Sequence, residues 1–142
     1  MKKLFSILMI AFSAVLFAQD QNISFNKLPQ KAQQFVKTYF GVKNVSVVTL
    51  DDDYIKKEYE VYLTNGTKIE FDGSGSWKEV DGKRNTIPAG YAPASIASYV
   101  KKSFPNAKIT KIEKNRFSYE VELSNGLDLE FNSKGQFKKI DD

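Results

Sequence analysis

The sequence predicts an α+β fold in which two tandem units, each a helix followed by four antiparallel strands, form one two-layer domain. Both helices are expected on one face of a continuous sheet. The first observation behind this prediction is a repeat: YEVYLTNGTKIEF at residues 59–71 nearly recurs as YEVELSNGLDLEF at residues 119–131. The second is that each copy follows a stretch with helical periodicity. A single unit of about fifty residues is too small to bury its apolar face well, so we expect the two units to share a core.

The N-terminus has the pattern of a secretory signal peptide. Lys2 and Lys3 precede an uncharged, largely apolar run over residues 4–18. The run is short for a membrane helix, which needs roughly 20 apolar residues, and Ala18 offers a small residue at a cleavage position. We therefore predict that residues 1–18 are removed, that no stable membrane anchor remains, and that the mature protein is periplasmic or secreted.

The rest of the chain divides into two units and their connections. The predicted boundaries are an N-terminal lead-in at 19–27, a first unit at 28–82, a linker at 83–91 and a second unit at 92–142. The chain contains no cysteine, so the stability of this exported protein must come from a packed core and not from disulfides. The whole chain has 11 phenylalanines, 7 tyrosines and one tryptophan, and those after residue 18 supply large side chains for that core.

Each unit opens with a predicted amphipathic helix that begins at a proline and ends at a phenylalanine, over residues 29–40 and 93–104. Side chains of the core face recur every three or four positions in both segments, which is the spacing of one helix face. Pro29 and Pro93 fit the first helical position, where the missing N–H costs nothing. The two faces consist of Ala32, Phe35, Val36, Tyr39 and Phe40 in the first helix and Ile96, Tyr99, Val100, Ser103 and Phe104 in the second.

The repeated segment alternates apolar and polar residues on both sides of an Asn-Gly pair, which predicts a hairpin of two half-buried strands. A two-residue turn at residues 65–66 would place Leu63 opposite Lys68 and mix the two faces. A three-residue loop with Gly66 in a left-handed conformation keeps the apolar residues together. The predicted pairs are Tyr59–Phe71, Val61–Ile69 and Leu63–Thr67, and in the second copy Tyr119–Phe131, Val121–Leu129 and Leu123–Leu127.

One strand before and one strand after each hairpin complete the four strands of a unit. The leading strands are predicted over residues 45–50 and 109–114, and the closing strands over residues 77–80 and 137–140. Glycine-containing polar stretches separate each hairpin from its closing strand and provide the last turn.

The charge pattern argues against a nucleic acid partner. The whole chain has a net charge of +4, and removal of the signal peptide takes two lysines, so 19 basic minus 17 acidic residues leave +2. Basic residues are interleaved with acidic ones, as at residues 56–58 and 111–114, whereas nucleic-acid-binding proteins usually gather them in one stripe. We expect no nucleic acid partner.

The residues that most often perform catalysis are missing from the chain. Without histidine and cysteine, it lacks the usual proton shuttle, the thiol nucleophile and the common transition-metal ligands. Carboxylates remain, but four of them fall at alternating strand positions, as expected for a solvated sheet face: Glu60, Glu70, Glu120 and Glu130. The sequence therefore predicts no catalytic residue, no cofactor and no enzyme.

Three motifs each occur twice: a helix that begins with Pro and ends with Phe, the hairpin YEV-x-L-[ST]-N-G, and the tail EF-[DN]-x-x-G-x-[WF]. Together they cover nearly all of the chain after residue 18. In these motifs the chain resembles the PepSY-like, β-lactamase-inhibitor-like (BLIP-like) family of exported bacterial proteins, which are built from tandem units. The resemblance implies a periplasmic or secreted binding or inhibitory module and brings no catalytic residues with it.

Because both helices cover one face of the predicted sheet, the other face is the natural binding surface. Trp77 and Val80 are three residues apart, so on a regular strand they point to opposite faces. With Val80 in the core, Trp77 points outward, and exposed aromatic residues dominate many interfaces. The alternative is a bulge that turns Trp77 inward, or a tryptophan that caps the sheet edge. The candidate protein-binding face consists of Tyr62, Lys68, Glu70 and Trp77.

The predicted function is an exported, non-enzymatic module that binds or inhibits another envelope or secreted protein through the helix-free sheet face. The alternative is a periplasmic protein that binds a small ligand or calcium at residues 51–53 or at the seam between the units. Residues 51–53 form an Asp-Asp-Asp run, and calcium takes oxygen ligands. Consecutive residues rarely converge on one ion, however, so a solvated turn is the simpler interpretation and no metal site is predicted.

Overall fold

The computed structural model describes residues 20–53 and 55–141, and the predicted signal peptide at residues 1–18 lies outside this part of the chain. The described residues form two α-helices, α1 (Gln30–Tyr39) and α2 (Ala94–Ser103), and each of them precedes four consecutive strands. Neither helix has the length and apolar character needed to span a membrane. Two 3₁₀ turns flank α1: η1 (Phe25–Lys27) and η2 (Val42–Asn44). The strands are β1 (Gln21–Ile23), β2 (Val45–Asp52), β3 (Lys57–Leu63), β4 (Lys68–Asp72), β5 (Trp77–Asp81), β6 (Ile109–Lys114), β7 (Ser118–Leu123), β8 (Asp128–Asn132) and β9 (Phe137–Asp141).

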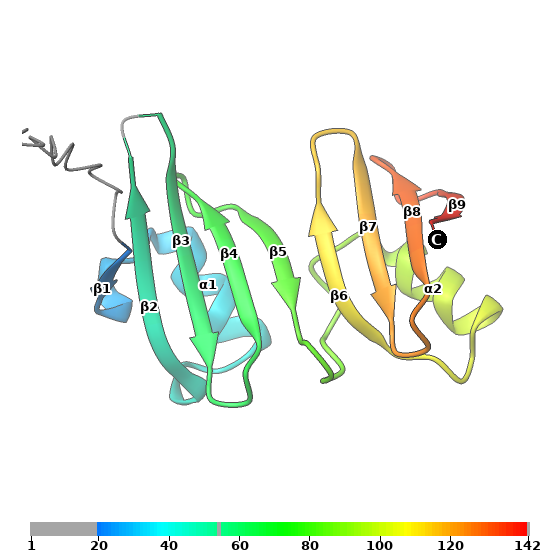
Figure 1. Cartoon of the computed structure of the whole chain (residues 1–142), viewed down its shortest axis with the longest axis horizontal. Helices are drawn as coiled ribbons and strands as arrows, with labels where there is room; N and C mark the ends of the chain where they lie inside the picture. Colours follow the sequence, from blue (N-terminus) through cyan, green and yellow to red (C-terminus); the bar gives the residue numbers. More distant parts are fainter. Residues whose placement is uncertain (1–19, 54, 142) are drawn as a thin grey trace, which may run out of the picture.

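In the described part of the chain, nine strands form one antiparallel sheet whose spatial order follows the sequence from β1 to β9. Both helices lie on the same side of this sheet (Figure 1). The predicted α+β fold, with its helices on one sheet face, is confirmed. The structure adds β1, which pairs with β2 at one edge of the sheet. Three residues are too few to show a periodicity in the sequence. The unit boundaries at 28–82 and 92–142 remain a prediction.

The helices form where the sequence supplies an apolar face. The side chains that point most directly into the core are buried: Ala32 and Val36 in α1, Ile96 and Val100 in α2. Pro29 and Pro93 lie one position earlier than predicted, at the N-cap, where each fixes an extended backbone before the first turn. The first helix ends before Gly41, whose φ of +83° breaks the helical path.

Both hairpins have the predicted register, with a three-residue loop. The observed pairs include Tyr59–Phe71, Val61–Ile69, Tyr119–Phe131 and Val121–Leu129. Gly66 and Gly126 have φ angles of +91° and +86°. Each of their N–H groups donates a 3.0 Å hydrogen bond to the carbonyl three residues earlier. Because residues with a Cβ rarely adopt this conformation, the glycine of each Asn-Gly pair fixes the loop length and therefore the register.

The sheet continues without interruption from the first half of the chain to the second. Strands β5 and β6 are joined through the pairs Glu79–Glu113, Val80–Ile112 and Asp81–Lys111. Beyond β5, the N–H of Gly82 donates to the carbonyl of Thr110 at 2.7 Å. The N–H of Ile87 donates to the carbonyl of Ile109 at 3.0 Å. These bonds hold the connection to α2 against β6.

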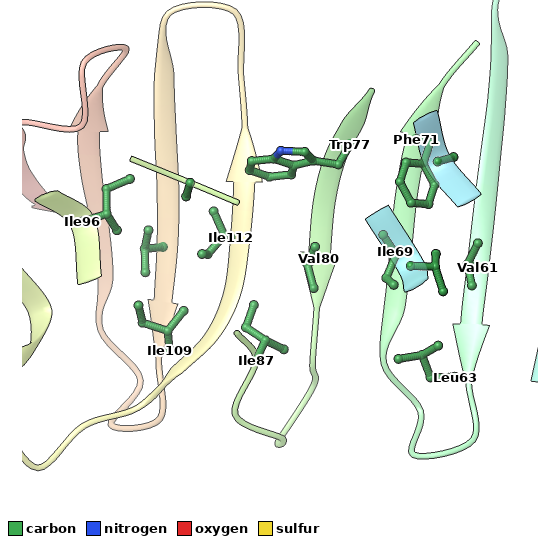
Figure 2. Close-up of a cluster of buried hydrophobic side chains, with 14 of the residues drawn as sticks. Val61, Leu63, Ile69, Phe71, Trp77, Val80, Ile87, Ile96, Ile109 and Ile112 are labelled. Atoms are coloured by element: carbon green, nitrogen blue, oxygen red, sulfur yellow. The ribbon is translucent and has the colours of Figure 1, made fainter. Parts of the chain in front are cut away.

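A single apolar layer fills the space between the sheet and the two helices. Its fully buried side chains come from six neighbouring strands and include Val61, Ile69, Phe71, Val80, Ile112, Val121, Leu129 and Phe131. Figure 2 shows part of this layer, with Val80 and Ile112 on the two strands that meet at the junction. Since the layer crosses the junction, the two halves of the chain share one core.

Candidate functional site

Trp77 lies in the core, so the prediction that it points outward is wrong. Its side chain is only 9% exposed. The centroid of its ring lies 6.3 Å from that of Phe35 on α1 and 5.0 Å from that of Tyr91. The Nζ atom of Lys114 lies 4.7 Å above the ring. Trp77 therefore packs on the helix side of the sheet, at the junction of β5 and β6 (Figure 2).

A β-bulge in β5 explains the orientation of Trp77. Glu70 of β4 pairs with Glu79, but the next residue, Phe71, pairs with Trp77. Lys78 is left as an extra residue on β5, which reverses the alternation of side chains beyond it. This bulge is the alternative that the sequence left open, and it removes Trp77 from the candidate binding face.

The sequence contains the signal for this bulge twice. Strand β9 has the same shift in register, with Lys138 as the extra residue. Phe137, the counterpart of Trp77, also faces the helices and stacks on Tyr99 of α2, with 4.4 Å between the ring centroids. A spacing of three between two large apolar residues, repeated in both closing strands, indicates a bulge more readily than it indicates two exposed aromatic residues.

The other three predicted site residues lie together on the helix-free face. Tyr62 and Lys68 are cross-strand partners in β3 and β4, and Lys68 Nζ lies 3.7 Å from Glu70 Oε1. The Tyr62 hydroxyl donates a hydrogen bond to the Glu60 carboxylate. This bond, together with burial, raises the pKa of Tyr62 to about 12. The phenol is therefore neutral and held in place, and its role in binding a protein remains a prediction.

A row of glutamates crosses the middle of the same face. Each member pairs in register with the next one on the neighbouring strand. This glutamate row consists of Glu60 (β3), Glu70 (β4), Glu79 (β5), Glu113 (β6), Glu120 (β7) and Glu130 (β8). Neighbouring strands lie about 4.8 Å apart, so the row is about 24 Å long.

Sequence reasoning assigned four members of the row to a solvated face but missed Glu79, Glu113 and the row itself. Those two residues meet across the β5–β6 pairing, and the two strands are separated in the chain by a helix. A hairpin turn fixes the register of the strands that it joins. No turn joins β5 to β6, so the local sequence carries no comparable signal for their register.

The centre of the glutamate row holds a proton near neutral pH. Burial, a hydrogen bond with Glu79 and repulsion from nearby carboxylates raise the pKa of Glu70 to about 7. Burial acts against the charged form of Glu79 too, but hydrogen bonds with Glu70 and Lys111 lower its pKa overall. Lys111 Nζ lies 3.0 Å from Glu79 Oε1. The pair therefore shares one proton, which Glu70 carries while Glu79 stays ionised.

Acidic residues are concentrated in the strands, whereas the segments that contain the helices are basic. Between residues 21 and 141, every aspartate and glutamate lies in a strand except Asp53. Residues 21–50 and 82–110, which include both helices, contain no acidic residue. Their basic residues are Lys27, Lys31, Lys37, Lys43, Lys83, Arg84, Lys101, Lys102 and Lys108. The helix layer is therefore basic, and the helix-free face carries most of the acids.

The acidic run at residues 51–53 does not converge on one point. Asp51 and Asp52 are successive residues of β2, so their side chains point to opposite faces. Asp53 Oδ1 accepts hydrogen bonds from the N–H groups of Ile55 and Lys56, both at 2.8 Å. Across residues 20–53 and 55–141, no group of three or more histidine, cysteine, aspartate or glutamate side chains is arranged to hold a metal ion.

Comparison with protein families identifies the family. A sequence profile described as "Putative beta-lactamase-inhibitor-like, PepSY-like" matches residues 57–139, which is more than half of the chain. The chain belongs to this family. The resemblance seen in the repeated motifs is thereby confirmed. No curated protein matches the chain.

Three solved structures from Bacteroides species are similar to the chain. One, from Bacteroides thetaiotaomicron, is described as "a putative calcium-regulated periplasmic protein"; it is 42% identical, has a TM-score of 0.81, and the match covers 87% of this chain and 97% of that one. Two from Bacteroides vulgatus, each described as "a putative periplasmic protein", are 40% and 33% identical, with TM-scores of 0.80 and 0.79. Those matches cover 87% of this chain and 98% and 100% of theirs. The predicted location, periplasmic or secreted, is confirmed.

Proposed function

We propose that the chain is a non-enzymatic periplasmic or secreted module that binds or inhibits another protein through its helix-free sheet face. The main support is the asymmetry of the fold: both helices lie on one side of the sheet (Figure 1). An antiparallel sheet can leave one face in water without any partner, so openness by itself is weak support. The inhibitor-like family and the concentration of carboxylates on this face make a binding role the better interpretation.

Among residues 20–53 and 55–141, the lack of a suitable catalytic arrangement supports a non-enzymatic role. The chain has no histidine and no cysteine. The group with the most unusual protonation, the Glu70–Glu79 pair, belongs to the open face of a sheet. General acid–base catalysis by carboxylates usually takes place in a concave pocket that orients a substrate and excludes water.

A capture experiment tests this proposal. The chain from residue 19, which contains the whole described structure, is immobilised and exposed to an envelope extract of the source organism, and bound proteins are identified by mass spectrometry. Tyr62→Arg alters the helix-free face, and Lys101→Glu alters the exposed surface of α2 as a control. We expect a specific protein to be bound by the wild type and by the control but not by Tyr62→Arg. Loss with the α2 variant alone would assign binding to the helix layer and refute the proposal.

Calcium binding is a second candidate function, because the similar protein from Bacteroides thetaiotaomicron is described as calcium-regulated. Asp51 and Asp52 point to opposite faces of β2, so the seam between the two halves of the chain is the remaining candidate position. A ligand that binds only the folded state raises the melting temperature, by an amount that grows with the logarithm of its free concentration relative to its Kd. We would measure melting with and without about 1 mM calcium, a concentration that suits weak extracellular sites. An unchanged melting temperature would remove this candidate.

A further inference from the structure

The glutamate row brings like charges together in a way that a folded protein would ordinarily avoid. Like charges directly opposite each other on neighbouring strands destabilise a sheet. The row contains five glutamate–glutamate pairs in succession, from Glu60–Glu70 to Glu120–Glu130, and the proton on Glu70 relieves the repulsion in only two of them. A face that had only to be soluble could alternate acids with lysines across the strands. Positions that break a local rule of stability in this way are commonly functional.

Lysines of the protein neutralise only part of the row. Lys68 lies near Glu70, Lys111 near Glu79 and Lys139 near Glu130. In the described part of the chain, Glu113 and Glu120 form no ion pair. A shallow hollow lies at these two residues, and it is lined by Lys111, Glu113, Glu120, Val121, Glu122 and Asp128. The second half of the face therefore presents carboxylates that have no cation of their own.

One end of the row carries a second feature that lacks a partner. Thr49 of β2 pairs with Glu60 and therefore lies in line with the row. The residue is only 9% exposed, yet its hydroxyl has no hydrogen-bond partner among the described residues. A buried hydroxyl without a partner loses its hydrogen bonds to water and gains nothing in return. A docked donor or acceptor would satisfy it only by displacing the side chains that cover it.

We infer that the helix-free face docks a lysine- or arginine-rich segment of the partner protein, with the basic side chains along the glutamate row. This inference rests on the proposed function and adds the chemistry of the partner. Charge complementarity is its basis, because basic side chains are the groups that pair with exposed carboxylates. A row about 24 Å long is too extended for one metal ion. It suits several cations spaced along a polypeptide.

Binding of a model cation tests the inference directly. The probe is a fluorescent peptide of about ten lysines, titrated with the protein and followed by fluorescence anisotropy at low ionic strength, about 20 mM, where screening is weak. The variant Glu79→Gln/Glu113→Gln removes two charges from the centre of the row. The matched control, Asp52→Asn/Asp53→Asn, removes two charges elsewhere. Circular dichroism first confirms that both variants are folded.

We expect the wild type to bind the peptide with a Kd that rises steeply with salt, and the row variant to raise this Kd by about tenfold or more. The control should change it by less than about twofold. If the two variants weakened peptide binding equally, binding would depend only on the net charge of the protein, and the inference would be overturned. Absence of peptide binding to the wild type would also overturn it, as would displacement of the peptide by calcium with the stoichiometry of a single ion.

The capture experiment, repeated with the row variant, distinguishes failure of this inference from failure of the proposed function. If Tyr62→Arg abolishes capture and the row variant leaves it unchanged, the helix-free face binds protein but the basic-segment inference fails. If neither variant affects capture, the proposed function fails too. If both abolish capture and the captured protein binds more weakly in high salt, the two proposals stand together.

Discussion

The position of Trp77 in the core changes what its removal is expected to do. The ring contacts Phe35, Tyr91 and Tyr119, so truncation would leave a large cavity between the sheet and α1. We predict that Trp77→Ala lowers the free energy of unfolding by about 3–5 kcal/mol, the usual range for a buried aromatic residue. Urea denaturation followed by circular dichroism measures this loss. Lys78→Ala, at the bulge residue beside it, is the control and should have a small effect. A similarly small loss for Trp77→Ala would contradict the packing.

Glu70 makes stability depend on pH in a defined direction. Burial, a hydrogen bond with Glu79 and repulsion from Glu79 and Glu60 raise its pKa from 4.5 to about 7 in the folded state, although Lys68 partly compensates. Between these values the folded state holds a proton that the unfolded state has released. Stability contributed by this proton is present at low pH and is lost as the pH rises toward 7.

Replacement of Glu70 by glutamine removes this dependence and relieves the repulsion. We predict that Glu70→Gln has a higher melting temperature than the wild type at neutral pH, and that the difference shrinks as the pH falls toward 4.5. Thermal melts across this window measure the difference. Asp52→Asn, which removes a charge away from the row, is the control. Parallel curves for the wild type and Glu70→Gln would show that the residue titrates as an ordinary exposed glutamate.

At the level of the elements, the turns before the closing strands determine how the helices sit on the sheet. Gly75 lies in the β4–β5 turn with a φ of +90°, and a Cβ built there would lie 2.8 Å from Cβ of Pro29. Gly135 holds the corresponding place beneath α2, where its Cβ would lie 2.6 Å from Cβ of Pro93. The Ser95 hydroxyl donates a 2.7 Å hydrogen bond to the Gly135 carbonyl. Each turn therefore packs directly against the start of a helix.

Substitution of two glycines in the first half of the chain measures the cost of a left-handed backbone separately from the cost of a clash with the helix. Gly66 also has a positive φ, of +91°, but a Cβ there would meet nothing within 4 Å. We predict that Gly66→Ala costs about 1–2 kcal/mol for the left-handed backbone alone. Gly75→Ala should cost about 1–3 kcal/mol more, because the added methyl must displace the helix. Chemical denaturation of the two variants gives the comparison. Equal losses would mean that the turn is not pressed against α1.

The elements also show where sequence reasoning succeeds. Helices and hairpins could be predicted because their determinants are local: an apolar stripe in residues 29–40, and an Asn-Gly loop that sets the hairpin register. The bulge at Lys78 and the β5–β6 pairing depend on packing between distant segments. The local alternation around Trp77 is compatible with a side chain that points outward or inward. Packing against distant residues of the core favours the inward orientation. The same limit explains why four members of the glutamate row were recognised and the complete row was not.

At the level of the whole molecule, the continuous sheet and the shared core predict cooperative unfolding. Trp77 is the only tryptophan in the chain and lies near Lys114 of β6 and Tyr119 of β7, so its fluorescence reports on the junction. We predict that the thermal transition seen by tryptophan fluorescence coincides with that seen by far-ultraviolet circular dichroism, as for a two-state domain. An earlier fluorescence transition would show that the two halves separate before they unfold.

The separation of acids and bases between the two layers also gives the molecule an electric dipole perpendicular to its sheet. The net charge of +2 that remains without residues 1–18 describes only the field at a distance. Within about 10 Å of the surface, the Debye length at 0.1 M salt, the two sides present potentials of opposite sign. A charged body that approaches exerts a torque, so the protein tends to rotate before contact. Its charge distribution therefore selects an orientation for encounters, even where it adds little to the attraction.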